Sequence, residues 1–137
     1  MAAAHVLWET SKLGRDERVV FYTRGGLLTA GLQRDWVELD FPAEPERPMT
    51  GDSSPATALG VKPKYIGMNR FDFVSRFFAP GAGIDEDPVA GSGHCFLGPH
   101  WKKRLGKDEF TAYQASERGG VVRVRVAGER VILSGKA

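Results

Sequence analysis

The chain has 137 residues, about the length of one ordinary domain, and its 42% hydrophobic and 26% charged content is typical of a globular protein. Its 19 basic and 17 acidic residues leave a net charge of only +2, which argues against nucleic acid as a partner. No apolar segment approaches the roughly 18 residues that a membrane-spanning helix needs, so we expect no membrane contact.

The first third of the chain is predicted to contain one short helix and three strands. Residues 2–9 are mostly helix formers. Residues 19–23 are β-branched or aromatic, and residues 27–30 follow them after a Gly-Gly turn, which predicts two paired strands. Residues 36–41 alternate apolar and polar side chains, as in a strand with one buried face. Prolines within residues 44–55 then predict a loop or an interdomain linker.

The rest of the chain is predicted to be rich in strands around one longer helix. This helix begins at Ser92 and ends before Gly106, with a kink or a restart at Pro99, because an internal proline removes a hydrogen bond. We expect strands at residues 64–67, 71–78, 111–115, 121–126 and 131–133. Strands grouped around few helices, rather than alternating with them, predict a mostly antiparallel α+β architecture.

Three acidic residues, Asp85, Glu86 and Asp87, lie just ahead of this helix, which starts near Gly91 and Ser92. Free backbone N–H groups at a helix start favour an anion such as a carboxylate. An acid beside them can transfer protons to or from a small acidic substrate. Asp87 with Gly91 and Ser92 is therefore the candidate site. The alternative is that the three acids only cap the helix.

Residues 86–95 read Glu-Asp-Pro-Val-Ala-Gly-Ser-Gly-His-Cys, and they resemble the E-D-P-V-T-G-S-A-H-C signature of the phenazine biosynthesis PhzF-like family. Other segments resemble this family in the same order along the chain, namely residues 3–8, 38–43, 73–80, 98–107, 113–120 and 135–137. Within the signature, Ala90 replaces the commoner threonine and Gly93 the commoner alanine. The resemblance covers most of the chain.

This resemblance implies the diaminopimelate epimerase-like α+β fold, in which curved, mostly antiparallel sheets each wrap around a central helix. In the incomplete form expected here, residues 1–50 are a remnant of the first domain and residues 51–55 a linker. Residues 56–137 are the second domain, with an internal deletion near residues 69–73. Family members have a longer N-terminal portion that carries an essential glutamate and a C-G-H-A-T turn, so we expect a truncated member.

The resemblance also implies an isomerase or epimerase that moves a proton on a small carboxylate-bearing metabolite in a biosynthetic process. It implies neither a metal ion nor an organic cofactor. Asp87 would be the catalytic acid or base, or a carboxylate that orients the substrate, and Gly91 and Ser92 would bind the substrate carboxylate. Because the glutamate segment is missing, the alternative is a catalytically inactive remnant that acts at most as a binding or self-association module. Unpaired strand edges favour a homo-oligomer, such as a dimer.

Other reactive or basic residues fit structural roles. His94 and Cys95 are adjacent, which does not suit a zinc site, so we expect His5 and His94 as core histidines and Cys95 as a buried thiol. A single cysteine also excludes an internal disulfide and fits a cytoplasmic protein. Arg123 and Arg125 alternate with valines, which predicts the solvated face of a strand. The three tryptophans are expected in the core.

Overall fold

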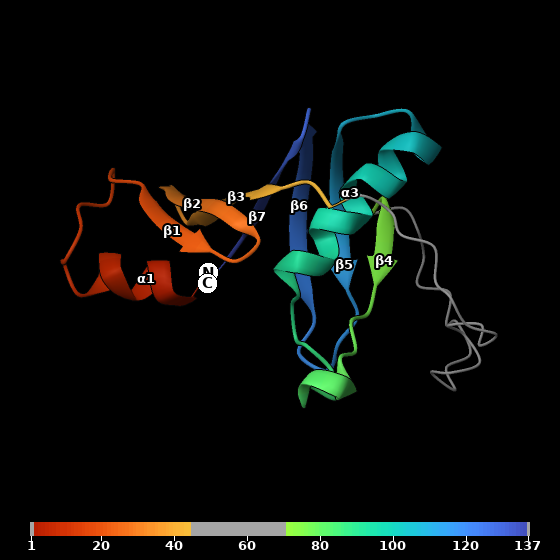
Figure 1. Cartoon of the computed structure of the whole chain (residues 1–137), viewed down its shortest axis with the longest axis horizontal. Coiled ribbons are helices and arrows are strands. Elements are labelled where there is room, and N and C mark those ends of the chain that lie inside the picture. Colours follow the sequence, from red (N-terminus) through yellow and green to blue (C-terminus); the bar gives the residue numbers. More distant parts are fainter. Residues whose placement is uncertain (1, 45–70, 137) are drawn as a thin grey trace.

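Seven strands form one sheet in the order β1-β2-β3-β7-β6-β5-β4 (Figure 1) in this computed structural model, which describes residues 2–44 and 71–136. The strands are β1 (Val19–Thr23), β2 (Gly26–Gln33), β3 (Trp36–Pro42), β4 (Phe73–Ser75), β5 (Glu109–Gln114), β6 (Gly120–Ala127) and β7 (Arg130–Gly135). The helices are α1 (Ala2–Glu9), the 3-10 helix η1 (Pro80–Ala82) and α3 (Gly91–Leu105). Only β4 and β5 run parallel, so the expected mostly antiparallel α+β architecture is confirmed.

The pairing of β3 with β7 joins the two ends of the chain into this sheet. Its register places Leu39 opposite Leu133 and Phe41 opposite Val131. The described residues therefore form one continuous sheet that carries both α-helices, where separate sheets around separate helices were expected. The predicted linker at residues 51–55 lies outside the described residues, and the division into two domains stays a prediction.

One row of side chains across the sheet shows where the core lies. The register places six buried residues side by side: Val19, Ala30, Leu39, Leu133, Val124 and Phe110. Trp8 of α1 and Cys95 of α3 belong to the same buried cluster, so both helices cover the same face of the sheet. Arg123 and Arg125 are exposed on the opposite face, as predicted. Burial of the apolar face is the main force that stabilises this arrangement.

Helix α3 lies very close to the sheet at Gly98. A Cβ atom at this position would lie 3.1 Å from side-chain atoms of both Val124 and Val126, so only glycine allows this approach without a shift. A kink or a restart was expected at Pro99, and the structure shows no restart, because one helix continues through Pro99. It ends at Gly106, whose φ of 67° is left-handed.

Two expected strands differ from the structure. The strand expected at residues 71–78 is limited to β4, because the chain turns away after Ser75 to form η1. The strand expected at residues 64–67 lies outside the described residues. No helix in the described part of the chain is long and apolar enough to span a membrane.

Candidate functional site

The turn between η1 and α3 holds Asp87 in a fixed position. The half-buried Asp87 accepts a hydrogen bond at Oδ1 from the backbone N–H of Val89, at 3.0 Å. The Asp87 N–H donates to the carbonyl of Phe77 at 2.9 Å. Helix α3 starts after Ala90, and no side chain caps it. The alternative interpretation of the three acidic residues as helix caps is therefore wrong.

The first turn of α3 consequently presents its backbone N–H groups without a capping side chain. Ser92 is exposed, and Gly91 is half-buried, with the ring of Phe41 3.5 Å from where a Cβ of Gly91 would lie. Such a helix end stabilises an anion by about 0.3–1 kcal/mol, and by up to ~2 kcal/mol when partly buried. The structure thus places Asp87, Gly91 and Ser92 on one short turn and the helix start that follows it.

Gln114 of β5 and Ser116 of the loop after β5 hold this turn by hydrogen bonds to its backbone. Gln114 is fully buried, and its Nε2 donates to the carbonyl of Asp87 at 2.5 Å while its Oε1 accepts from the N–H of Ala90 at 2.8 Å. The Ser116 hydroxyl donates to the carbonyl of Pro88 at 2.7 Å. Neither role was predicted from the sequence. The available signal was a glutamine in line with Phe110 and Ala112, at a buried position of an alternating strand.

An ion pair closes the loop that leads to Asp87. Arg76 donates two hydrogen bonds to the Glu86 carboxylate, at 2.7 and 2.9 Å. These hydrogen bonds lower the pKa of Glu86 below its ordinary value. Exposed ion pairs contribute little to stability, so the main consequence of this one is geometric. It brings the residue before Asp87 back to the end of β4.

His94 and Cys95 are both buried in the first turns of α3. Desolvation raises the pKa of the Cys95 thiol to about 12, so this thiol is not a nucleophile at neutral pH, as predicted. The Nδ1 of His94 lies 2.7 Å from the carbonyl of Ala90, and its Nε2 lies 3.4 Å from the Ser75 hydroxyl. Burial lowers the pKa of His94, and the bond to Ala90 only partly offsets this. His94 is therefore a neutral core histidine, as predicted.

A cavity of about 980 Å³ adjoins the turn. Val89 forms part of its wall, although Asp87, Gly91 and Ser92 are not among the described residues that line it. The charged residues in this described lining are Arg118, Arg123 and Lys136, without any carboxylate. His5 also lines the cavity and is half-buried, so its prediction as a core residue is wrong. A cavity with this charge favours an anionic ligand.

Trp36 contributes an aromatic side chain to this cavity from the sheet face opposite the buried core. Alternation along β3 buries Val37 and Leu39 against the helices and turns Trp36 to the other side. The Arg123 guanidinium lies 4.0 Å from the centre of the Trp36 ring, within the range of a cation–π interaction. The prediction of a core role is therefore wrong for Trp36, whereas it is confirmed for Trp8, which is 4% exposed.

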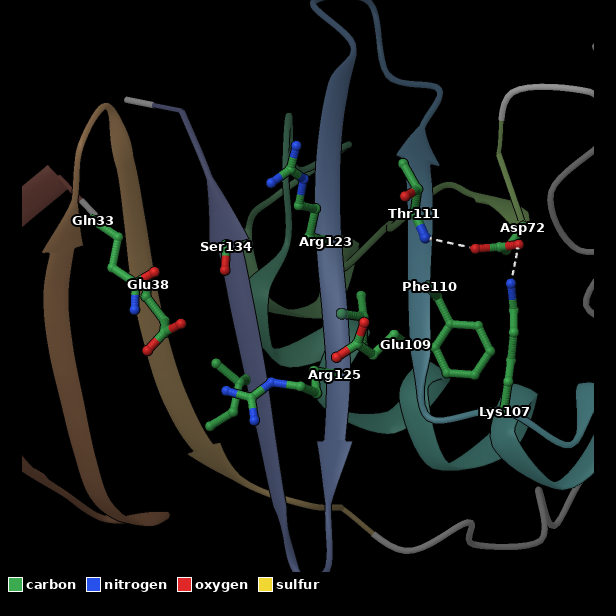
Figure 2. A pocket seen from close by; sticks show the side chains of 12 residues that line it. Gln33, Glu38, Asp72, Lys107, Glu109, Phe110, Thr111, Arg123, Arg125 and Ser134 are labelled. Atoms are coloured by element: carbon green, nitrogen blue, oxygen red, sulfur yellow. Dashed lines mark hydrogen bonds and ion pairs between the residues drawn. The ribbon is translucent and has the colours of Figure 1, made fainter.

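A second, more open pocket of about 730 Å³ lies on the same face of the sheet (Figure 2). Basic and acidic side chains alternate across it, such as Arg125 and Glu109. At its edge the Asp72 carboxylate accepts hydrogen bonds from Lys107 at 2.5 Å and from the N–H of Thr111 at 2.7 Å. Burial alone would raise the pKa of Asp72, but these bonds hold it below its ordinary value. The charges offset one another, so this pocket has no clear preference for an anion or a cation.

A metal site is not formed by the described residues, where no group of three or more histidine, cysteine, aspartate or glutamate side chains could hold an ion.

The sequence and the fold are similar to those of one family. Residues 43–137 match the family described as phenazine biosynthesis-like protein. An uncharacterized isomerase of Halalkalibacterium halodurans is 36% identical over an alignment that includes all of this chain and 68% of that protein. An uncharacterized isomerase of Pseudomonas aeruginosa is 35% identical over all of this chain and 67% of its own length. This chain therefore spans about two thirds of each relative.

A solved structure supports the same relationship. The crystal structure of a phenazine biosynthesis protein of the PhzF family from Enterococcus faecalis matches 99% of this chain and 67% of its own chain. Its TM-score is 0.77 at 29% sequence identity. The alignment with the H. halodurans relative runs over 179 positions and includes the 137 residues of this chain, so about 42 positions have no residue here.

Proposed function

Because this chain belongs to the phenazine biosynthesis-like family of PhzF proteins, we propose that it transfers a proton on a small carboxylate-bearing metabolite, as an isomerase does. One observation carries this proposal. Asp87 and the uncapped start of α3 lie on one turn, which Gln114 holds and which adjoins a cavity lined by cations. The same hydrogen bonds therefore fix the positions of an acid and of a helix start, whose free N–H groups favour an anion.

Each group has a role in the proposed reaction. The N–H groups of Gly91 and Ser92 bind the substrate carboxylate, and the cations of the cavity attract it. The Asp87 carboxylate removes a proton from a carbon next to an unsaturated or carbonyl group. The C–H electron pair moves into the conjugated system, and the proton returns at another carbon, so the product is an isomer and Asp87 is restored. General acid–base catalysis of this kind contributes typically about 10²–10⁴-fold.

A second proposal is a module that binds or self-associates without catalysis, and one observation favours it. The terminal strand β1 presents Tyr22 with 88% and Val20 with 47% of their surface exposed. Apolar side chains on a terminal strand favour pairing with another chain. In this second proposal the protein is a homo-oligomer, and the turn around Asp87 binds a carboxylate without transferring a proton.

Solvent deuterium exchange separates the two proposals. The protein is incubated in D2O with cyclohexene carboxylates and amino acids, and deuterium incorporation at carbon is followed by NMR and mass spectrometry. Proton transfer by Asp87 predicts incorporation with the wild type and a loss of at least about 100-fold with Asp87→Asn. The variant Asp85→Asn is the matched control, because Asp85 is exposed and precedes the Asp87–Ala90 segment that Gln114 holds. No incorporation from any compound would refute the catalytic proposal and leave the second one.

A further inference from the structure

Gln114 uses both ends of its side-chain amide on a single turn. The amide is fully buried, its Nε2 donates to the Asp87 carbonyl at 2.5 Å, and its Oε1 accepts from the Ala90 N–H at 2.8 Å. These two peptide groups flank Pro88 and Val89, which connect the acid to the start of α3. The side chain thus bridges the first and the last residue of the connection.

We propose that Gln114 is a positioning residue that sets the geometry between the Asp87 carboxylate and the N–H groups at the start of α3. This inference rests on the proposed function of the turn as a carboxylate site. Gln114 itself touches no substrate. It acts through the backbone, because its rigid amide plane fixes how far the carbonyl of Asp87 lies from the N–H of Ala90.

The chemistry of the amide explains why few side chains can replace it. The position needs one donor and one acceptor, separated as in a carboxamide. An ionised glutamate would have only acceptors, so it would keep the bond from Ala90 but place an oxygen against the Asp87 carbonyl. A protonated glutamic acid has one O–H donor and one carbonyl acceptor, and therefore reproduces the glutamine pattern.

The other hydrogen bonds of the turn do not connect the Asp87 carbonyl with the Ala90 N–H. The Val89 N–H donates to Asp87 Oδ1, and the His94 Nδ1 lies 2.7 Å from the Ala90 carbonyl. The Ser116 hydroxyl reaches Pro88, and the Asp87 N–H reaches Phe77. None of these contacts links Asp87 to Ala90. Loss of the Gln114 donor would therefore free the Asp87 carbonyl while β5, β6 and α3 keep their packing.

The variant Gln114→Glu gives the test, because its effect should reverse with pH. Burial raises the pKa of a carboxyl group, so this glutamate is protonated at pH 5, and the ionised fraction grows as the pH rises toward 8. Benzenesulfonate is the probe, because it stays anionic over this range. At pH 8 we expect the Kd of Gln114→Glu for benzenesulfonate to be about fivefold higher than that of the wild type. At pH 5 the two Kd values should agree within twofold.

A second measurement needs no ligand. The ¹³C chemical shift of the Asp87 carbonyl reports the hydrogen bond directly, and it should move at pH 8 in Gln114→Glu and return at pH 5. The wild type is measured beside it, since it has the same titratable and charged groups around the turn. These are Asp87 itself, His94 at the Ala90 carbonyl, and Glu86, Glu117 and Arg118, which share a pocket with Pro88 and Ser116. The variant Val126→Ala controls for lost stability, because Val126 is buried near the far end of β6.

The outcomes separate the inference from the proposed function. If wild type fails to bind benzenesulfonate, the carboxylate site is refuted, and the carbonyl shift alone decides whether Gln114 holds the turn. If Gln114→Glu binds as wild type at pH 8 although the carbonyl shift has moved, the positioning role is overturned. Should Gln114→Glu unfold at pH 8, Gln114→Met is compared at pH 7, because it removes both bonds without burying a charge. Binding by Gln114→Met at wild-type affinity would also overturn the inference.

Discussion

His94 shows how one buried side chain links the candidate site to the stability of the protein. Its ring is 1% exposed, one nitrogen contacts the Ala90 carbonyl, and the other faces Ser75 of β4. Phe73 lies against the ring, with the two ring centres 6.1 Å apart. A neutral imidazole satisfies these contacts with one donor and one acceptor, whereas a protonated ring has two donors.

This environment predicts that acid destabilises the protein through His94. Burial lowers the pKa of His94 below its ordinary value of 6.5, so between these two pKa values the unfolded chain binds a proton that the folded chain does not. The stability contributed by the neutral ring is present above about pH 6.5 and is lost as the pH falls toward the folded-state pKa. The loss is at most about 1.4 kcal/mol per pH unit.

Urea unfolding at pH 7, 6 and 5 measures this effect. The wild type should lose more stability over this range than His94→Gln, which cannot take up the proton. Equal losses in the two proteins would show that other groups cause the acid sensitivity.

The burial of single residues was predicted well where their position in a helix or an alternating strand determines which way the side chain points. Cys95 is buried and Arg123 lies on the open face, because helix position and strand alternation fix those outcomes. Trp36 was assigned to the wrong face, because its hydrophobicity suggested burial. Its side chain lies on the open face, because side chains alternate along β3 and Val37 and Leu39 are the buried ones. Gln114 was missed as a contact of the turn, because a hydrogen bond between residues 24 or 27 positions apart leaves no local pattern.

At the scale of elements, the contact of α3 with the sheet depends on Gly98. The substitution Gly98→Ala gains up to about 1 kcal/mol of helix propensity. It also places a methyl group 3.1 Å from Val124 and Val126, and overpacking of this kind typically costs about 1–3 kcal/mol. We expect a net destabilisation of about 1 kcal/mol, because β-branched side chains in paired strands have little freedom to move.

A double-mutant cycle with Val124→Ala checks this explanation. Removal of the valine methyl groups should cancel part of the cost of Gly98→Ala, so the two unfolding free energies should not add. Additive effects would show that the helix does not press on Val124, and a stabilised Gly98→Ala protein would contradict the close contact itself.

The sequence predicted most of the described elements, because their patterns are strong. Alternation identified β3 and β6, and Gly106 marked the end of α3. The length of strand β4 was overestimated, because apolar side chains continue past Ser75 to Phe77. In the structure Phe77 lies in the loop before Asp87 and packs beside Gly93. Pairing of β4 with β5 is a tertiary feature that local composition does not encode.

For the whole molecule, strand β1 predicts self-association. Within the described residues β1 pairs only with β2, and Val20 and Tyr22 project from it with large exposed surfaces. Natural proteins avoid such strand edges by placing charges on them. We therefore expect the wild type to associate at high micromolar concentration, and Tyr22→Lys to reduce this association.

Sedimentation velocity measures this self-association. The variant Val121→Lys is the control, since Val121 is also exposed but lies in β6, between two other strands. Equal association of the two lysine variants would show that hydrophobicity rather than the strand edge drives assembly. A wild type that stays monomeric at high micromolar concentration would contradict the prediction.

The arrangement of the whole sheet was the least predictable feature. Local patterns gave the strands, but they did not show that β3 pairs with β7 and so joins segments about 90 residues apart. The expectation of two sheets came from the family resemblance. The alignment with the H. halodurans relative leaves about 42 of its 179 positions without a residue in this chain. The internal deletion near residues 69–73 stays a prediction.

In the proposed reaction the turn from Asp87 to Ser92 binds a small carboxylate, and a titration of the ¹⁵N-labelled protein with benzoate measures this binding at the turn itself. We predict amide shifts at Gly91, Ser92 and Gly93 with millimolar affinity, equivalent to about 4 kcal/mol, which sulfate reverses by competition. Asp87→Asn should bind at least as tightly, because it removes a negative charge beside the anion. If saturating benzoate leaves these three amides unmoved, or shifts only residues far from the turn, the turn is not a carboxylate site.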